Sequence, residues 1–303
     1  MTRIVFGCGY LGGRVAKLWC NAGDHTVAAT RRDDPTAGMI EARAFCGQAD
    51  VTKPDTLKWL SDIPRLGESP VESLLYAVGH DRNAGPDIHA VYAGGLQNVL
   101  AALPPSVTRV VYISTTGVYG PAGGDWVDEQ TRPDPQRDGG RASLAAEHVL
   151  AAHPIGRRSV ILRLAGIYGP GRVPYLEKLR AGEPLAVPRA GWLNLIHVDD
   201  AARIVVAADE WAAARAASDG PYVFCVSDGS PVARGDYYAE AARLIGAPPP
   251  TFCPPPSDSP AAARAAADRR VSNEKMSRTL GVPLRYPSYR EGLAAILATT
   301  ASS

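Results

Sequence analysis

The sequence predicts an α/β fold, with a doubly wound parallel sheet and a smaller carboxy-terminal lobe. Short apolar runs alternate with segments of helical period through the first half of the chain, an order typical of a parallel sheet covered by helices on both faces. After Arg163 this alternation gives way to loop-rich sequence. A chain of 303 residues is long enough for one such unit with an appended lobe.

The predicted elements follow one another in β–α order. Near-continuous apolar or β-branched composition predicts strands over residues 3–6, 26–30, 44–46, 73–78, 109–114 and 159–164. Apolar residues at helical spacing predict helices over residues 11–22, 56–61, 87–102 and 142–152. Further along, the pattern predicts a helix over 198–214, a strand over 222–228 and a last helix over 289–298. The stretch from Gly246 to Pro260 contains seven prolines and is predicted to be an extended loop without regular structure.

Charge and composition exclude several classes of partner. The chain has 32 basic and 31 acidic residues, so it has no field that would gather on nucleic acid or on an anionic membrane. No signal-peptide pattern begins the chain and no apolar run approaches about 18 residues, which predicts a soluble cytoplasmic protein. The five cysteines and six histidines lack metal-ligand spacing, so free thiols and no metal site are expected.

Three glycines lie between the first predicted strand and the first predicted helix. Gly7, Gly9 and Gly12 form G-x-G-x-x-G in that context, with Tyr10 and Leu11 between the last two. In such a loop the first glycine permits a tight turn, the second lets the backbone approach a pyrophosphate, and the third lets the helix lie close to the sheet. The pattern therefore predicts a Rossmann dinucleotide site, with a plain βα turn as the alternative.

The end of the second predicted strand bears on which dinucleotide is bound. NAD sites usually place an Asp or Glu there, where the carboxylate accepts hydrogen bonds from the ribose hydroxyls. This chain has Thr30, Arg31 and Arg32 instead, and a guanidinium pairs well with a 2′-phosphate. The sequence thus favours NADP over NAD. The alternative is that both arginines are solvated surface charges and that Asp33 supplies the acid.

With the glycine loop, the segments TRR, ISTTGVYG, RLAGIYGPG and NLIHVDDAA together resemble the extended and atypical short-chain dehydrogenase/reductase family, also described as NAD-dependent epimerase/dehydratase. The resemblance extends from residue 2 to about residue 297. It implies an NAD(P)-binding Rossmann domain over residues 1–165, to which 195–228 return, and a substrate-binding lobe mainly over 166–303. It also implies oxidoreductase, epimerase or dehydratase chemistry on a nucleotide sugar or another small polar metabolite, and a homodimer as an open expectation.

The resemblance assigns further cofactor-binding positions. Those outside the glycine loop and the TRR segment are Asp50, Val51, Ala77, Val78, Gly79, Ser114, Ile167 and Tyr168. Among them, Asp50 is implied to lie beside the adenine, and Ser114, together with Thr115, near the nicotinamide and the substrate. Asp50 could instead precede a cap at Thr52, and the two hydroxyls could satisfy backbone groups at a strand end. His197, Asp199 and Asp200 match a family motif whose role is mainly structural.

The family's catalytic pair is missing from this chain. In the family, the strand that bears the Ser or Thr is followed by the motif Tyr-x-x-x-Lys. The Tyr of this motif moves a proton, and the Lys lowers the pKa of the phenol from its free value of about 10. Aligning RASLAAEHVL by its AAE puts Gly139 in the Tyr position and Ser143 in the Lys position. No Tyr or Lys lies between Gly120 and Leu162. In addition, Tyr92 stands where the family usually has an Asn that helps a proton relay.

If the protein is an enzyme, its acid or base must come from elsewhere. The catalytic candidates are Ser114, Thr115, Tyr119 and Tyr168, although either phenol could simply be packed. Arg163 and Arg172 could bind an anionic group or form structural ion pairs. Two functions therefore stay open. One is an NAD(P)-dependent oxidoreductase or isomerase of the epimerase/dehydratase type with non-standard acid/base residues, and the other is a catalytically silent NADP-binding redox sensor or regulator.

Overall fold

The computed structural model describes residues 1–31, 44–65, 70–81 and 85–300. The chain forms two compact units, each assembled from segments that are distant in the sequence. Unit 1 comprises Met1–Thr115, Asp138–Arg163 and Ala202–Phe224. Unit 2 comprises Thr116–Arg137, Leu164–Ala201 and Cys225–Ser303. The assignment of a cofactor domain to residues 1–165 and a substrate lobe to 166–303 stays a prediction.

A seven-stranded sheet with the order β12-β7-β5-β4-β1-β2-β3 forms the centre of unit 1. The strands are β1 Thr2–Phe6, β2 His25–Thr30, β3 Ala44–Gln48, β4 Val71–Tyr76, β5 Arg109–Thr115, β7 Val160–Leu164 and β12 Tyr222–Val226. β1 pairs in parallel with β2 and β4, β2 with β3, and β4 with β5. The α/β fold class predicted from the sequence is confirmed.

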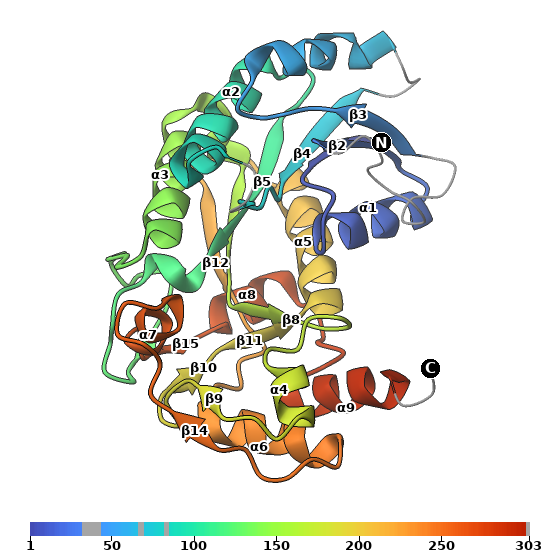
Figure 1. The fold of residues 1–303 in the computed structure, drawn as a ribbon. Helices are drawn as coiled ribbons and strands as arrows, with labels where there is room; N and C mark the ends of the chain where they lie inside the picture. Colours follow the sequence, from blue (N-terminus) through green and yellow to red (C-terminus); the bar gives the residue numbers. More distant parts are fainter. Residues whose placement is uncertain (32–43, 66–69, 82–84, 301–303) are drawn as a thin grey trace. The chain divides into compact units, whose positions relative to one another are not determined.

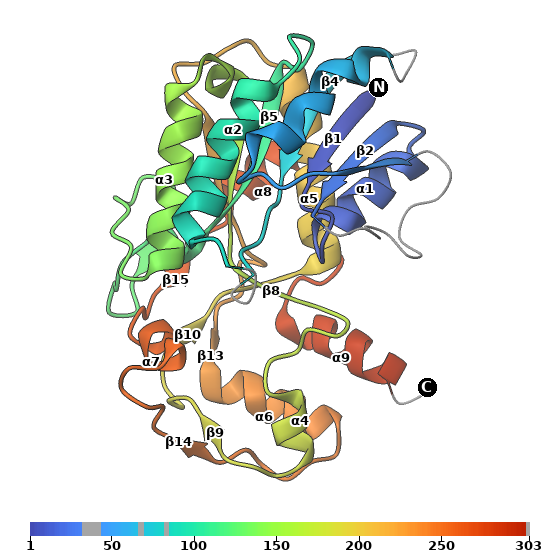
Figure 2. The same cartoon turned by 45° about the horizontal axis from the view of Figure 1, so that its top comes forward.

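Helices cover both faces of this sheet. Figures 1 and 2 show α1 (Gly12–Asn21) and α5 (Val198–Ala213) on one face and α2 (Gly95–Ala102) and α3 (Asp138–Ala152) on the other. Successive side chains of a strand point to opposite faces, so a sheet covered on both sides needs continuous apolar strands. In β1, Ile4, Val5 and Phe6 are all buried, and Ile4 and Phe6 belong to the hydrophobic core that also includes Leu96 and Ala146 of α2 and α3.

The helix predicted over residues 87–102 is interrupted. Residues Ala90–Gly94 form a π-helical turn, η2, before α2 begins at Gly95. A Cβ on Gly95 would lie 2.6 Å from both the Tyr76 hydroxyl oxygen and Val51 Cγ2, so the backbone approaches the sheet too closely for a side chain. Elsewhere in unit 1, residues Pro54–Arg65 form a 3₁₀ helix, η1, and Pro154–Arg158 form the shorter η4.

Unit 2 is built from short paired strands and short helices. β8 (Gly166–Tyr168) pairs in parallel with β11 (Leu195–His197), β9 (Leu185–Ala186) with β14 (Phe252–Cys253), and β6 (Trp126–Val127) with β15 (Arg270–Val271). β10 (Trp192–Leu193) pairs antiparallel with β13 (Val232–Ala233). The helices are η3 Thr116–Val118, α4 Leu176–Arg180, α6 Arg234–Leu244, α7 Pro260–Ala265, α8 Glu274–Leu280 and α9 Tyr289–Thr300. Tyr168, Tyr237 and Leu293 lie in the core of this unit.

The proline-rich stretch from Gly246 to Pro260 contains regular structure, contrary to the prediction. Phe252 and Cys253 form β14, which pairs with β9. These two residues lie between two runs of three prolines and keep the backbone N–H groups that prolines lack. The amide of Leu185 also donates to the carbonyl oxygen of Thr251 at 2.9 Å. No helix in the described part of the chain is long and apolar enough to cross a membrane.

Candidate functional site

The loop between β1 and α1 contains the predicted G-x-G-x-x-G motif. Two of its glycines are required by the backbone conformation or by close packing within the protein. Gly7 has a φ of +91°, and a Cβ there would lie 2.4 Å from the carbonyl oxygen of Ala77. A Cβ on Gly12 would lie 2.2 Å from the carbonyl oxygen of Gly7. Both positions thus exclude any larger residue, because the loop packs closely against β4 and against itself.

Gly9 is different. Its φ lies outside the left-handed region, and a Cβ there would meet no described atom within 4 Å. Gly79, in the loop that follows β4, has the same two properties. Backbone conformation and packing against the described residues therefore leave both glycines unexplained, and both lie at the carboxyl ends of neighbouring strands. Ligands of open α/β sheets bind at this edge.

The first turn of α1 is suited to an anion. Its N-cap residue, Leu11, makes no side-chain hydrogen bond, and the turn contains no acidic residue. Arg14 adds a positive charge there: its Nη1 donates to the carbonyl oxygen of Tyr10 at 2.7 Å, and its guanidinium lies 4.4 Å from the centre of the Tyr10 ring. Arg14 was not among the predicted site residues. Its position, two residues after the third glycine, could have indicated it from the sequence.

Arg31 follows Thr30, the last residue of β2. Its Nη2 lies 3.9 Å from Oδ2 of Asp81, and both side chains are exposed, with 37% and 51% of their surface accessible. Arg31 therefore keeps a solvent-facing guanidinium at the position where the sequence predicts contact with a 2′-phosphate. Arg32 and the alternative acid, Asp33, lie outside the described residues.

Asp50 and Val51 follow β3 and are held by local contacts. Oδ1 of Asp50 accepts hydrogen bonds from the Thr52 amide at 3.0 Å and the Thr52 hydroxyl at 2.7 Å. Partial burial acts to raise the pKa of Asp50, but these hydrogen bonds and the charges of Lys53 and Arg31 hold the pKa below its usual value. Val51 is buried, and its carbonyl oxygen accepts a hydrogen bond from Asn98 Nδ2 at 2.9 Å. Asp50 thus forms a local turn with Thr52, and adenine contact by Asp50 or Val51 stays a prediction.

Ser114 belongs to a buried polar network at the end of β5. Its hydroxyl donates to Oε1 of Glu147 at 2.5 Å, and Arg163 donates to Oε1 and Oε2 of the same carboxylate at 3.0 and 2.7 Å. Arg163 therefore forms the structural ion pair that the sequence allowed as one of two alternatives. Glu147, which accepts from both Ser114 and Arg163, was not among the predicted site residues. Thr115, one residue further along, is only partly buried.

The positions of the missing Tyr and Lys are occupied by residues that cannot transfer a proton in their place. A Cβ on Gly139 would meet only Ile88 Cδ1 among the described residues, at 3.9 Å. The Ser143 hydroxyl donates to the carbonyl oxygen of Gly139 at 2.8 Å, one turn back in α3. Ser143 is also buried, so α3 offers neither a phenol nor an ammonium group at these two positions.

The two candidate phenols of unit 2 are packed in its interior. Tyr119 is buried, and its hydroxyl oxygen lies 3.1 Å from Cys225 Sγ. Tyr168 is buried and donates to the carbonyl oxygen of Ser288 at 3.3 Å. Burial, and then the nearby charge of Asp228, raise the pKa of Tyr168 well above its ordinary value. These contacts favour the packing alternative for both phenols, and their catalytic role stays a prediction, as does ribose contact by Tyr168 and half-buried Ile167.

The segment that contains His197, Asp199 and Asp200 also makes structural contacts. The Asp200 carboxylate, fully buried, accepts hydrogen bonds from the backbone amides of Arg285 and Tyr286, each at 2.8 Å. The ring centre of His197 lies 3.9 Å from that of Tyr286. Two amide donors satisfy a carboxylate that would otherwise be costly to bury.

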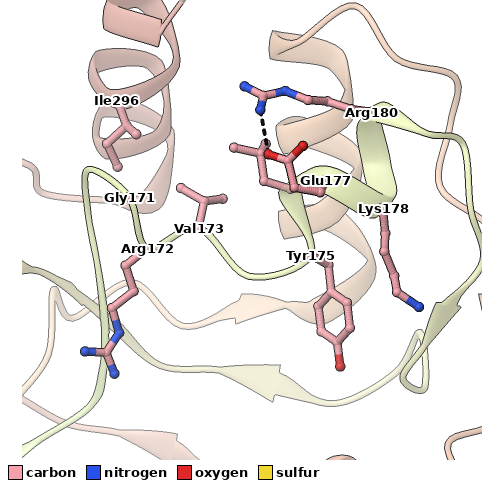
Figure 3. A pocket seen from close by; sticks show the side chains of 9 residues that line it. Gly171, Arg172, Val173, Tyr175, Glu177, Lys178, Arg180 and Ile296 are labelled. Carbon is pink, nitrogen blue, oxygen red and sulfur yellow. Dashed lines mark hydrogen bonds and ion pairs between the residues drawn. The ribbon is translucent and has the colours of Figure 1, made fainter.

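A pocket of about 480 Å³ opens in unit 2 beside α4 (Figure 3). It is lined by Gly171, Arg172, Val173, Tyr175, Leu176, Glu177, Lys178, Arg180 and Ile296. Arg180 Nη1 lies 2.6 Å from Glu177 Oε1 and is paired with it, whereas Arg172 and Lys178 project at the sides of the pocket (Figure 3). Arg172 thus lines a pocket whose cations outnumber its acid, which suits an anionic or polar ligand.

Comparison with known proteins places these features in one family. Residues 4–219 match the model of the NAD dependent epimerase/dehydratase family. The chain belongs to this family. The match extends over more than half of the chain and includes the glycine loop, the strand that carries Ser114, and α3. The family predicted from the sequence is therefore confirmed, and this member has Gly139 and Ser143 where the resemblance places Tyr and Lys.

Individual proteins are similar to this chain in sequence or in fold. Protein YeeZ of Escherichia coli (strain K12) is 32% identical over 171 residues, which cover 56% of this chain and 58% of that protein. A 3-diazoavenalumate denitrifying reductase of Streptomyces is 29% identical over 222 residues, covering 64% of this chain and 67% of that protein. The UDP-glucuronic acid 4-epimerase of Bacillus cereus, solved in complex with NAD, has the same fold, with a TM-score of 0.77 over 100% of this chain and 99% of that one at 18% identity.

Proposed function

We propose that unit 1 of this family member binds a nicotinamide dinucleotide across the loop between β1 and α1. The observation that carries the proposal is the pair of open glycines, Gly9 and Gly79, which neither packing nor backbone conformation requires. A pyrophosphate that lies against the loop would account for both, since a Cβ at either position would project into its space. The first turn of α1 and Arg14 supply complementary positive charge.

NADP is the preferred form in this proposal. Arg31 presents an exposed guanidinium directly after β2. Positions 30 and 31 hold Thr and Arg, so neither supplies the Asp or Glu that would bind an unmodified ribose. The nearby Asp81 and Asp50 would compete weakly for this guanidinium, because the Asp81 contact is long and solvent-exposed. A 2′-phosphate, with two charges and three acceptor oxygens, would bind the guanidinium more strongly than either acid.

The bound nicotinamide would supply hydride transfer in an oxidation, reduction or epimerisation of a nucleotide sugar or another small polar metabolite. The Streptomyces relative, a reductase, supports the redox chemistry, and the Bacillus cereus neighbour, an epimerase of UDP-glucuronic acid, supports a nucleotide sugar as the substrate. Thr115, only partly buried at the end of β5, is the hydroxyl best able to bind a substrate oxygen. Ser114 directs its proton to Glu147 and would act only as an acceptor.

A second function is a catalytically silent NADP-binding regulator. The observation that favours it is that α3 lacks the usual catalytic side chains. Gly139 has no side chain, and the Ser143 hydroxyl donates to the carbonyl oxygen of Gly139 in the same helix. In this alternative the dinucleotide would be bound without turnover. Cofactor binding without hydride transfer to any carbonyl or sugar nucleotide would distinguish it from the enzyme.

The test of dinucleotide binding is Gly9→Ala. The added methyl group meets no described atom, so the variant should fold with the melting temperature of the wild type. Its affinity for NADPH and NADP+ should fall by about tenfold or more, measured by thermal-shift titration with all four nicotinamide dinucleotides. Gly220→Ala is the matched control, because Gly220 lies just before β12 and its added Cβ also meets nothing within 4 Å. Equal cofactor affinity in the wild type and Gly9→Ala would refute binding across this loop.

A further inference from the structure

We propose that Tyr92 is the catalytic acid of this protein and replaces the phenol that α3 lacks at Gly139. The inference rests on the proposed function, because it assigns the proton donor for a reaction at the nicotinamide. It concerns unit 1 alone, in which Tyr92, the glycine loop and the loop after β4 all lie.

Tyr92 lies at the edge of the sheet where the dinucleotide is proposed to bind. Its hydroxyl oxygen accepts a long hydrogen bond, 3.4 Å, from the backbone amide of His80. His80 directly follows Gly79, one of the two open glycines. The phenol of Tyr92 is therefore positioned beside the same loop that borders the proposed cofactor space.

The proton of Tyr92 has no acceptor among the described residues. The hydroxyl oxygen accepts from His80, and no described group accepts the hydrogen in return. Tyr92 is half-buried, and it packs against the hydrophobic core of unit 1. We place the ligand at the hydroxyl end of this side chain, beside the His80 amide. Neighbouring phenols of unit 1 differ, because Tyr76 donates to the carbonyl oxygen of Val91 at 2.8 Å, Tyr112 donates to that of Ser143 at 3.5 Å, and both are buried.

The local backbone brings the turn that carries Tyr92 against α3. Tyr92 is the central residue of the π-helical turn η2, and such turns are rare and often occur at functional sites. Ile88, four residues earlier, is the described side chain nearest to a Cβ on Gly139. The turn that carries Tyr92 thus packs against the start of α3, where the family's Tyr would otherwise project.

The reaction balances with Tyr92 as the acid. In the reductive direction the carbonyl carbon of the substrate gains a hydride from the reduced nicotinamide, the C=O π bond breaks, and the carbonyl oxygen takes the phenolic proton of Tyr92. The substrate is reduced to an alcohol and the nicotinamide is oxidised. Tyr92 is left as a phenolate, hydrogen-bonded to the His80 amide, and regains a proton from water. The reverse direction uses the phenolate as the base.

The test is Tyr92→Phe, which keeps the ring and removes only the hydroxyl. Titration of phenolate absorbance, with and without saturating NADP+, reads the phenol directly and needs no substrate. In the wild type one phenol should titrate about one pH unit lower when NADP+ is bound, because the cationic nicotinamide favours the phenolate. This shift should be absent in Tyr92→Phe and present in Tyr222→Phe. Tyr222 is half-buried at the start of β12, the outermost strand of the sheet, and its hydroxyl donates to the carbonyl oxygen of Ala216 at 3.5 Å.

Turnover gives the second readout. With any carbonyl substrate that the wild type reduces, Tyr92→Phe should lower kcat by about 10²- to 10⁴-fold and leave the Kd for NADPH unchanged. If NADP+ binds but the titration shift is the same in the wild type and Tyr92→Phe, Tyr92 is not the acid, and the proposed function stands without it. If the wild type binds no dinucleotide, the proposed function fails and the inference fails with it.

Discussion

Asp228 makes the stability of unit 2 depend on pH. It follows β12, and its Oδ1 accepts a hydrogen bond from the Ser230 amide at 2.9 Å, whereas Oδ2 is buried and has no hydrogen-bond partner among the described residues. Burial, and then the charge of Glu291, raise the pKa of Asp228 to about 7. In the unfolded chain the pKa returns to about 3.9. Between these two values the native protein holds a proton that the unfolded chain has lost.

The sign and size of the effect follow from this difference. The folded pKa is raised, so the contribution of Asp228 to stability is fully present below about pH 4 and is lost as pH rises through about 7. Three pKa units correspond to about 4 kcal/mol, which is an upper bound because water entry and local relaxation reduce the cost of the buried charge. Asp228→Asn keeps a polar group that cannot ionise, so this loss should disappear.

Equilibrium urea unfolding of the wild type and of Asp228→Asn, at intervals from pH 4 to pH 9, measures the effect. We expect the difference in the free energy of unfolding to grow in favour of the variant as pH rises from 4 to 8 and then to level off. Asp258→Asn, at an exposed acid of the same unit, is the control and should follow the wild type. A difference between Asp228→Asn and the wild type that does not change with pH would refute a buried, neutral Asp228.

Two further predictions concern unit 1. Arg31→Ala should lower the affinity for NADPH by about 10- to 100-fold, because one charge-assisted contact to the 2′-phosphate is lost, and it should leave the affinity for NADH unchanged. Fluorescence titration measures both affinities. Arg141→Ala, which removes another exposed arginine, is the control. Equal losses for the two cofactors would contradict the assignment. Glu147→Ala should lower the free energy of unfolding by about 3–5 kcal/mol, since it removes the carboxylate that pairs with the buried Arg163 guanidinium. Urea unfolding should show partial recovery in Glu147→Leu with Arg163→Met. A loss below about 1 kcal/mol would contradict this reasoning.

The elements that depend on local pattern were predictable from the sequence. The strands over 109–114 and 159–164 are continuous apolar or β-branched runs, and such runs form the buried strands β5 and β7. The G-x-G-x-x-G spacing likewise marks Gly7 and Gly12, whose backbones are too close to Ala77 and to each other for any side chain. Each of these features is set mainly by residues that are near one another in the chain.

Features that depend on distant partners were not predictable. The network of Ser114, Glu147 and Arg163 requires the relative register of β5, α3 and β7, which no local pattern gives. The π-helical turn η2 ends beside Gly95, whose backbone lies close to Tyr76 and Val51, and these residues precede it by about 20 and 40 positions. β14 exists because β9, far along the chain, provides a pairing edge for Phe252 and Cys253.

The incomplete state of α3 does not by itself separate an enzyme from a silent dinucleotide-binding protein. General acid–base catalysis contributes about 10²- to 10⁴-fold, or roughly 3–5 kcal/mol of the activation barrier. Correct placement of a hydride donor against its acceptor can contribute about 7–11 kcal/mol. A protein that keeps the placement and lacks the usual acid is therefore expected to be slow, and a brief multiple-turnover assay would miss it. Long single-turnover incubations with excess protein over reduced cofactor are the decisive measurement, because only a complete absence of hydride transfer there would support the regulator.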